Sequence, residues 1–442
     1  LVFLSRGGSD ANVVREFDLE SKSFIKDGFS LPESKGSASW AGPDRVFVNR
    51  DFGEGSLTHS GYPRTVRLWT RGQSLDEAPT IFEGEVDDVS VSGWALLDEG
   101  FERQFVPQGT DFYNSNLFLI DNGDLITVEK PTDANASFHR EHMFLDLDSD
   151  WELAEGKIHP AGSLLAIEFE TFLAGNRNFH VLFEPASNKT LLGYSTMRDA
   201  VLLRILEDVR HRLEVASFQE GSWINAALAS GDGFQALSIW PVDPREGDAY
   251  YLTRSGYTDP PSLHVGHLNA GKKTQTIKRS PSYFDTSDVN VKQHWAVSKD
   301  GTRIPYFEVA REGDGNARPT LLYGYGGFQV SMLPSYSATI GAGWLERGGV
   351  YVVANIRGGG EFGPKWHQAA LKRNRMRAYE DFIAVAEDLI ARGVTTSDQL
   401  GIQGGSNGGL LMGNMLAMRP KLFGAVVAQV PLFDMKRYHR ML

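Results

Sequence analysis

The sequence predicts two kinds of architecture in one chain: a β-propeller, followed by an α/β domain built on a parallel sheet. Three observations lead to this prediction. The 442 residues suffice for roughly two to three domains, each with its own core. Residues 1–285 consist of short apolar or alternating runs between turn-forming residues, which is typical of β structure. From residue 286 onward, strand-like and helix-like segments alternate, as in a parallel sheet with helical crossovers.

The β region is expected to contain many short strands. Turn-forming residues at 121–124 and 160–163 are expected to close hairpins. The segment from Arg198 to Val215 is compatible with an amphipathic helix, but inside a β array we expect two strands that turn near Glu207 and Asp208. Further strands are expected at residues 12–19, 44–49, 116–120, 164–169, 236–240 and 250–253.

A loose repeat favours a propeller. An aromatic or apolar residue, a turn with Gly or Asp and then a strand recur at residues 40–48, 159–169 and 223–239. A propeller blade takes about 40 to 45 residues, so this region would hold about six to seven blades. We therefore expect an incomplete β-propeller domain over residues 1–285 and a partial α/β domain over residues 286–442, joined by a short polar connection.

The α/β domain is predicted from its alternating elements. Strands are expected at residues 320–323, 350–355, 399–403 and 424–430, and helices at residues 379–392 and 408–418. The first helix places Phe382, Val385 and Leu389 on one face, and Gly393 follows its end. Pro420 is expected to stop the second helix.

Composition excludes several classes of function. The formal net charge of -12 repels phosphate backbones and anionic lipid, so no nucleic acid partner is expected. The absence of cysteine excludes disulfides, thiolate metal sites and a cysteine nucleophile, and it leaves a cytoplasmic or periplasmic location open. No apolar run approaches the ~18 residues of a membrane span, so no membrane partner is expected. Neither a metal nor another cofactor is expected.

Chemistry is indicated by residues 404–409, which satisfy the G-x-S-x-G pattern between a predicted strand and a predicted helix. Such a turn strains the serine backbone and exposes the Ser406 hydroxyl, while the N–H of Asn407 at the helix start can face a developing oxyanion. A purely structural turn or a phosphate-binding loop are the alternatives. A phosphate loop would have a lysine after the glycines, whereas Leu410 and Leu411 stand there.

A second glycine-rich segment, residues 323–328, follows the strand expected at 320–323. In α/β-hydrolases the loop after an early strand supplies the other oxyanion donor. Tyr325 is the candidate through its phenol group, although an isolated tyrosine is more often an ordinary packed side chain.

Together these motifs resemble the prolyl oligopeptidase family of serine peptidases, which have an α/β-hydrolase domain and a seven-bladed propeller. The likeness rests on residues 323–328, 354–363, 404–409 and 419–424, in the family's order and spacing. It is close over residues 290–442 and looser before them. The resemblance implies that Ser406 is the nucleophile, that the Asn407 N–H and the Tyr325 hydroxyl hold the oxyanion, and that Phe328 and Leu432 line the specificity pockets. Residues 357–363 are expected to shape a loop near the site.

The catalytic acid and base are expected to lie outside this chain. In α/β-hydrolases they follow the nucleophile in the order acid, then histidine. Asp434 and His439 follow Ser406, but Asp434 stands directly after the next strand, and the family takes both partners from later loops. His367 precedes the nucleophile, against that order. We therefore expect a fragment truncated at both ends, with little activity by itself.

The resulting functional hypothesis is a serine oligopeptidase that hydrolyses short peptides through an acyl-enzyme on Ser406, with post-proline-like specificity. Two alternatives remain: an acyl-peptide hydrolase or esterase with the same machinery, and a catalytically inactive propeller protein that binds a partner. Neither the specificity at the cleaved residue nor the oligomeric state follows from the sequence.

Overall fold

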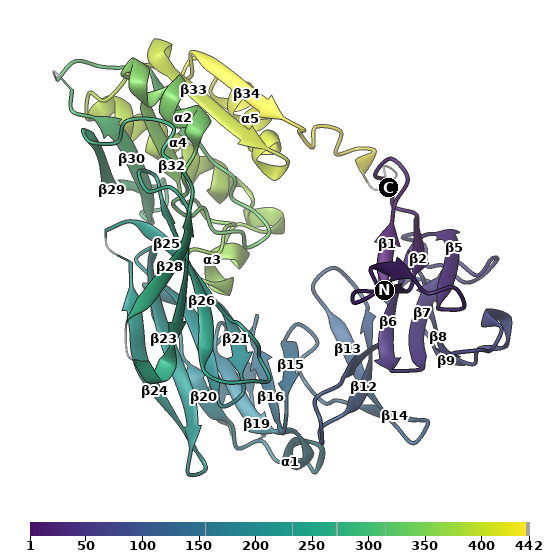
Figure 1. The fold of residues 1–442 in the computed structure, drawn as a ribbon. Coiled ribbons are helices and arrows are strands. Elements are labelled where there is room, and N and C mark those ends of the chain that lie inside the picture. Colours follow the sequence, from purple (N-terminus) through teal and green to yellow (C-terminus); the bar gives the residue numbers. More distant parts are fainter. Residues whose placement is uncertain (155, 232, 271–272, 314, 439–442) are drawn as a thin grey trace. The chain divides into compact units, whose positions relative to one another are not determined.

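The computed structural model describes residues 1–154, 156–231, 233–270, 273–313 and 315–438 (Figure 1). It contains two compact units. The first comprises residues 1–154 and 165–179, and the second comprises residues 156–164 and 180–438. Each unit has its own apolar clusters.

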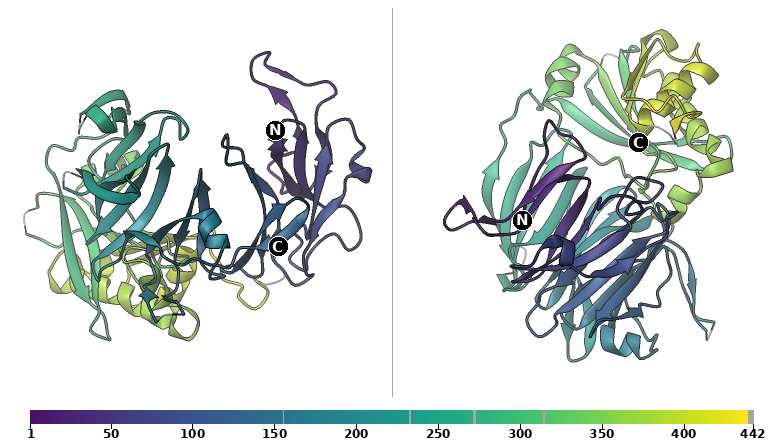
Figure 2. Two further views of the ribbon diagram at one scale, coloured as in Figure 1. Left: turned by 90° about the horizontal axis from the view of Figure 1, so that it is seen from below. Right: turned by 90° about the vertical axis from the view of Figure 1, so that its right-hand side faces the viewer.

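The first unit is built from antiparallel sheets, which Figure 2 shows from two further sides. Its sheets have the orders β1-β2-β5, β6-β7-β8-β9 and β10-β12-β13-β14, with β11 paired to β12. Strands β15, β16 and β19 are neighbours, in this order, in a further antiparallel sheet. The elements are β1 Val2–Leu4, β2 Asn12–Arg15, β3 Phe17–Asp18, β4 Ser23–Phe24, β5 Ser30–Ser34, β6 Gly36–Gly42, β7 Arg45–Arg50, β8 Thr65–Thr70, η1 Leu75–Glu77, β9 Thr80–Glu83, β10 Ser90–Val91, β11 Trp94–Leu96, β12 Arg103–Gly109, β13 Ser115–Asp121, β14 Asp124–Thr127, β15 Asn135–His139, β16 His142–Asp146, β17 Trp151–Glu152, β19 Leu164–Glu168 and α1 Phe169–Leu173.

The second unit contains further antiparallel sheets and then the α/β sheet. Strands β21 to β24 form one four-stranded sheet and β25 to β28 form another, each in sequential order. The elements are β18 Ile158–His159, β20 His180–Phe183, β21 Lys189–Met197, β22 Ala200–Glu207, β23 Arg210–Gln219, β24 Ser222–Ser230, β25 Gln235–Pro241, β26 Ala249–Gly256, β27 Ser262–His267, η2 Leu268–Ala270, β28 Thr274–Arg279, β29 Val289–Val297, β30 Arg303–Arg311, β31 Thr320–Tyr323, α2 Ala338–Gly343, η3 Leu345–Arg347, β32 Val350–Ala354, α3 Pro364–Gln368, η4 Lys372–Asn374, α4 Met376–Ala391, η5 Ser397–Gln399, β33 Leu400–Gly405, α5 Asn407–Met418 and β34 Ala425–Gln429.

Consecutive β-sheets stack through shared apolar clusters, as blades of a propeller do. Val14 of β2 clusters with Val46 of β7, and Phe47 of β7 clusters with Val106 of β12. In the second unit Leu202 of β22 shares a cluster with Leu252 of β26. Sequential antiparallel sheets that bury one another's faces are the pattern of a propeller, so the predicted β architecture is confirmed.

The turns that the sequence predicts are mostly correct. Asn122 and Gly123 both have positive φ and close the β13–β14 hairpin. The segment 198–215 is two paired strands, β22 and β23, with Asp208 at a φ of 49° in their turn. The hairpin expected at 160–163 is wrong, because this turn joins β18 to β19, which lie in different sheets.

The α/β sheet has the order β29-β30-β32-β31-β33-β34. Strands β32, β31, β33 and β34 are parallel, as predicted. The sequence patterns do not predict strands β29 and β30. These strands make the sheet mixed, since β30 pairs antiparallel with both β29 and β32. A tight turn at Ser298–Thr302 joins these two strands, so no crossover helix marks them in the sequence.

The two faces of the α/β sheet bury different partners. On one face, Phe382 of α4 and Met412 of α5 share a cluster with Leu322 of β31. On the other face, Phe307 of β30 clusters with Val209, in the turn between β22 and β23, and with Tyr257, directly after β26. The second unit therefore contains blades that are fixed to the α/β sheet.

Truncation of the core side chain Phe382 tests the first of these faces. Phe382 is fully buried, so Phe382→Ala removes apolar burial and leaves a cavity that should lower the free energy of unfolding of the second unit by about 3–5 kcal/mol. Urea unfolding followed by intrinsic fluorescence measures this change. The control Val297→Ala, at a side chain that is 66% exposed, should change it by less than about 0.5 kcal/mol. An equal effect of both variants would contradict the assignment of this core.

Candidate active site

The parallel pairing of three strands brings the candidate residues to one edge of the sheet. Tyr323 at the end of β31 is in register with Val353 of β32 and with Gln403 of β33. The loops that follow these three strands therefore leave the sheet at the same carboxyl edge, where ligands of α/β sheets bind. The first two loops carry residues 324–329 and 355–363, and Ser406 alone separates β33 from Asn407, the first residue of α5. Most of the residues that the sequence predicts for the site lie in these segments.

Ser406 occupies the turn between β33 and α5 in a strained backbone conformation. Its φ of 56° and ψ of -116° lie in a region that non-glycine residues rarely adopt. Its amide donates to the carbonyl of Gln429 on β34 at 3.0 Å, and its carbonyl accepts from Leu410 in the first turn of α5 at 3.1 Å. The residue is exposed although its neighbours Asn407 and Gly408 are buried. This is the geometry of a nucleophile held out from a sharp strand-to-helix turn.

Glycines around Ser406 allow the backbone segments to approach closely. A Cβ placed on Gly404 would lie 2.4 Å from the carbonyl oxygen of Gly408 and 2.9 Å from that of Gly324. A Cβ on Gly408 would lie 2.6 Å from the same Gly324 oxygen, and a Cβ on Gly409 would lie 2.8 Å from the Gln429 oxygen. These contacts are with backbone atoms that cannot rotate away, so only glycine fits at these positions.

Both expected oxyanion donors lie beside the turn. Asn407 is the first residue of α5, so its amide N–H has no acceptor within the helix and is available to a ligand. Its side-chain amide donates to the backbone carbonyl of Tyr325 at 2.7 Å. The Tyr325 ring packs over Gly408, where an added Cβ would lie 3.5 Å from the ring atom Cδ2. The structure thus brings Tyr325 beside the Ser406–Asn407 turn, although Tyr325 lies 82 residues before Asn407 in the sequence.

The two residues expected in the specificity pockets lie in the loops after β31 and β34. Phe328 has a φ of 54° and its side chain is 43% exposed. Leu432 is half-buried and follows Pro431, which packs against the start of α5 at Gly409. Both positions flank the Ser406 turn, and their role in specificity stays a prediction.

A buried charge cluster supports the loop after β32, and no pattern in the sequence predicts it as a unit. Arg357 is 4% exposed, and its guanidinium donates to Asp381 of α4 at 2.6 and 2.9 Å and to Asp300 at 2.5 and 3.2 Å. Burial alone would lower the pKa of Arg357, but the hydrogen bonds to both carboxylates raise it. The same hydrogen bonds lower the pKa of Asp300. Only the spatial proximity of Asp300, 57 residues before Arg357, reveals this cluster.

Glu361 is a second buried ionisable residue in that loop. One carboxylate oxygen, Oε1, accepts from the amide of Met332 at 2.8 Å and from the side chain of Asn355 at 3.1 Å. The other oxygen has no hydrogen-bond partner among the described residues. Burial raises the pKa of Glu361 from an ordinary value of 4.5 to about 7. Because Met332 continues the loop after β31, Glu361 ties the loops after β31 and β32 together.

The structure gives no support to a triad formed by Asp434 and His439. The carboxylate of Asp434 accepts hydrogen bonds from the amide and side chain of Arg437, at 3.1 and 2.5 Å, in a local turn. His439 lies outside the described residues. His367 is buried in α3, where burial and the nearby Arg375 lower its pKa. Within the described ranges, no histidine is hydrogen-bonded to the Ser406 hydroxyl.

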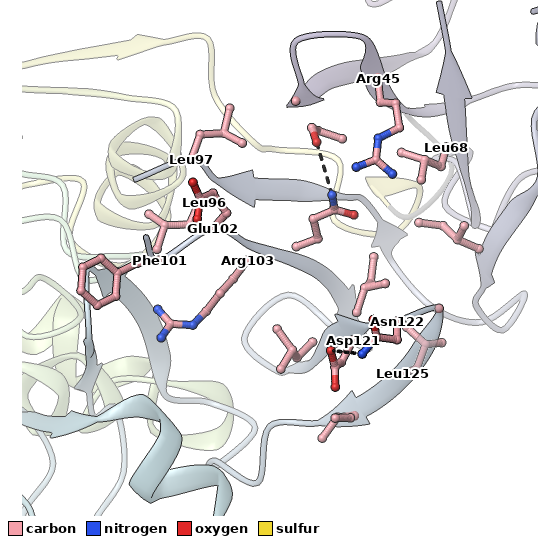
Figure 3. A pocket seen from close by; sticks show the side chains of 18 of the residues that line it. Arg45, Leu68, Leu96, Leu97, Phe101, Glu102, Arg103, Asp121, Asn122 and Leu125 are labelled. Atoms are coloured by element: carbon pink, nitrogen blue, oxygen red, sulfur yellow. Dashed lines mark hydrogen bonds between the residues drawn. The ribbon is translucent and has the colours of Figure 1, made fainter. Parts of the chain in front are cut away.

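A separate groove of about 1210 Å³ lies in the first unit (Figure 3). Apolar side chains such as Leu68, Leu96 and Leu125 line it beside charged ones. Arg103 in its wall is already bound to Glu170 at 3.0 Å and to the carbonyl of Arg140 at 2.6 Å. All lining residues belong to the first unit, so the groove contains none of the residues predicted for the site.

The described part of the chain offers neither a metal-binding cluster nor a membrane-spanning helix. Among the described residues there is no group of three or more His, Asp or Glu side chains that could hold a metal ion. In the same part of the chain, no helix has the length and apolar character needed to cross a membrane.

Two family models match the chain. The model described as "Prolyl oligopeptidase, N-terminal beta-propeller domain" matches residues 3–279, and the one described as "Prolyl oligopeptidase family" matches residues 335–441. The chain belongs to the prolyl oligopeptidase family. This membership confirms the propeller and the α/β domain that the sequence predicts.

Individual relatives agree with this assignment. An uncharacterized peptidase of Sinorhizobium fredii is 42% identical over 453 residues, covering 100% of this chain and 62% of its own length. A prolyl endopeptidase of Elizabethkingia meningoseptica is 38% identical over 458 residues, covering 99% and 61%. The structure of a post-proline cleaving enzyme from Rickettsia typhi superimposes with a TM-score of 0.92 at 33% identity, covering 99% and 66%. The chain therefore spans less than two thirds of the length of these relatives.

The buried carboxyl group of Glu361 makes stability depend on pH. Between about pH 4.5 and 7 the unfolded state releases this proton while the folded state keeps it, so stability falls as the pH rises through this window. In the wild type this effect should lower the free energy of unfolding by on the order of 3 kcal/mol between pH 4.5 and 8. Glu361→Gln, which mimics the protonated acid, should abolish this decrease. Urea unfolding of the second unit at both pH values measures it. The exposed control Glu312→Gln should keep the wild-type pH dependence, and an unchanged profile in Glu361→Gln would contradict the prediction.

Proposed function

We propose that this chain carries the nucleophile and oxyanion site of a serine oligopeptidase that cleaves short peptides after proline-like residues. The observation that carries the proposal is the strained, exposed backbone of Ser406 at the start of α5, with Asn407 and Tyr325 linked beside it. Strain of this kind persists only where the surrounding structure enforces it, and it is concentrated at functional sites. Membership in the prolyl oligopeptidase family supplies the reaction class.

In the proposed reaction the Ser406 hydroxyl attacks the scissile carbonyl carbon and forms a tetrahedral intermediate. The N–H of Asn407 and the hydroxyl of Tyr325 donate to its oxyanion, and collapse releases the amine and leaves an ester on Ser406. Water then hydrolyses this ester. The proton of Ser406 passes to a histidine, which we propose lies beyond residue 442 together with its acidic partner. The chain by itself should therefore be a weak catalyst.

We propose that residues 1–285 form the propeller domain and residues 286–442 the first part of the catalytic domain. Phe328 and Leu432, which flank the Ser406 turn, would line the pocket for the side chain before the cleaved bond. The curated and structural relatives include enzymes described as prolyl endopeptidase and post-proline cleaving enzyme, which supports proline at this position.

The nucleophile and one oxyanion donor can be tested separately in the complete gene product. Ser406→Ala should lower kcat by about 10⁶ because the catalytic residues act as a unit, whereas Tyr325→Phe should lower it by about 10² to 10³. Hydrolysis of a proline-containing peptide and mass-spectrometric mapping of a fluorophosphonate label measure these effects. Ser187→Ala and Tyr283→Phe, at exposed positions, serve as matched controls. Labelling of a serine other than Ser406 would contradict the proposal.

The attached propeller should restrict substrates by size. Within the second unit, Phe234 and Tyr257 pack on Phe307 of the α/β sheet, so blades are fixed to the catalytic domain rather than free to swing away. Blades around an axis leave only a narrow channel, which admits a short peptide but not a protein chain. We expect kcat/KM to be far higher for a peptide of about ten residues than for an unfolded protein with the same cleavage sequence. Comparable values would exclude gating by the propeller.

A further inference from the structure

Arg375, just before α4, reaches two elements of the candidate oxyanion site. Its Nη1 donates to the carbonyl of Gly326 at 2.6 Å, and its Nη2 donates to the side-chain oxygen Oδ1 of Asn407 at 3.1 Å. The Asn407 amide in turn donates to the carbonyl of Tyr325 at 2.7 Å. One guanidinium and one amide thus connect the loop after β31 with the first residue of α5.

The charge of Arg375 has an unusual environment. Arg357 in the neighbouring loop is neutralised by Asp381 and Asp300, whereas Arg375 has no ion pair among the described residues. Its guanidinium is half-buried and lies 5.3 Å from the ring centroid of Tyr379. Because no carboxylate competes for this guanidinium, its charge-assisted hydrogen bonds go to the Gly326 carbonyl and to Asn407 Oδ1.

The two groups that accept hydrogen bonds from Arg375 lie next to, or on, the residues that carry the candidate oxyanion donors. Gly326 immediately follows Tyr325, so a hydrogen bond to the carbonyl of Gly326 restrains the backbone one residue after the tyrosine, and Asn407 holds the carbonyl of Tyr325 itself. Asn407 provides its backbone N–H to the oxyanion, while its side chain is held between Arg375 and Tyr325. The loop is also crowded, since a Cβ on Gly327 would lie 2.4 Å from Nδ2 of Asn407. A shift of either segment would change the separation of the two donors.

We infer that Arg375 is a positioning residue that sets the distance between the Tyr325 hydroxyl and the Asn407 N–H. This inference rests on the proposed function. Oxyanion stabilisation requires donors that are in place before charge develops, and a misplacement of about 1 Å can cost about 10²-fold in rate. Loss of Arg375 should therefore act on kcat more than on KM, because the oxyanion exists only in the transition state and intermediate.

Hydrogen exchange tests the structural link without depending on activity. In the 442-residue chain, Arg375→Met should release the carbonyl of Gly326 and increase amide exchange in the 324–330 loop, where Gln329 and Val330 donate to Gly358 and Gly327. Arg375→Lys can keep one of the two hydrogen bonds and should give an intermediate effect. Arg373→Met, an exposed arginine in the preceding 3-10 turn, is the matched control. Exchange that is unchanged in Arg375→Met would overturn the inference, whatever the activity.

A double-mutant cycle in the complete gene product tests the catalytic consequence. Arg375→Met should lower kcat about 10- to 100-fold in the wild-type background, with partial rescue by lysine and little change in KM. In the Tyr325→Phe background the same substitution should cost much less, because the donor that it positions is already absent. Equal costs in both backgrounds would show a merely structural role and overturn the inference. A wild-type protein that is not labelled at Ser406, with loop exchange still dependent on Arg375, would refute the proposed function and with it the catalytic part of this inference.

Discussion

The candidate site depends on the close approach of three backbone segments at the end of β33. The carbonyl oxygen of Gly324 would lie within 3 Å of a Cβ on either Gly404 or Gly408, so the loop after β31, the strand β33 and the helix α5 meet without side chains between them. Ser406, with its positive φ, lies in the turn between β33 and α5 at this contact. The contact also places Tyr325 and Asn407 close to Ser406, because Tyr325 directly follows Gly324 and Asn407 directly precedes Gly408.

Buried polar groups stabilise the loops around this contact. Arg357 joins α4 to the turn between β29 and β30 through two carboxylates, and Glu361 accepts from Met332 in the loop after β31. Each group carries a desolvation cost that its hydrogen bonds must offset, so the removal of one partner would leave an uncompensated charge or dipole in the interior. Such networks hold a loop in one arrangement, which suits a site whose donors must be preorganised.

The boundary between the two compact units does not coincide with the change from β-type to alternating strand and helix patterns near residue 285. Blades formed by β21 to β28 belong to the same unit as the α/β sheet, because Phe307 and Val309 bury their side chains against Val209 and Tyr257. Sequence patterns reflect the local periodicity of apolar residues, whereas the compact units are defined by contacts between elements that can be distant in the sequence. Blades of the second unit therefore share an apolar core with the α/β sheet.

Local patterns in the sequence determined the β-propeller, the four parallel strands, helices α4 and α5, and the Ser406 turn, because periodicity, glycine and proline act over a few residues. The antiparallel strands β29 and β30 and the misassigned hairpin at 160–163 depended on pairing between distant segments, which no local pattern encodes. The same holds for Arg357 with Asp300 and for Arg375 with Gly326, 57 and 49 residues apart. Only the tertiary structure determined these contacts. The sheet as a whole decides which strand edges and helix ends lie together, and these in turn decide which partner a side chain finds.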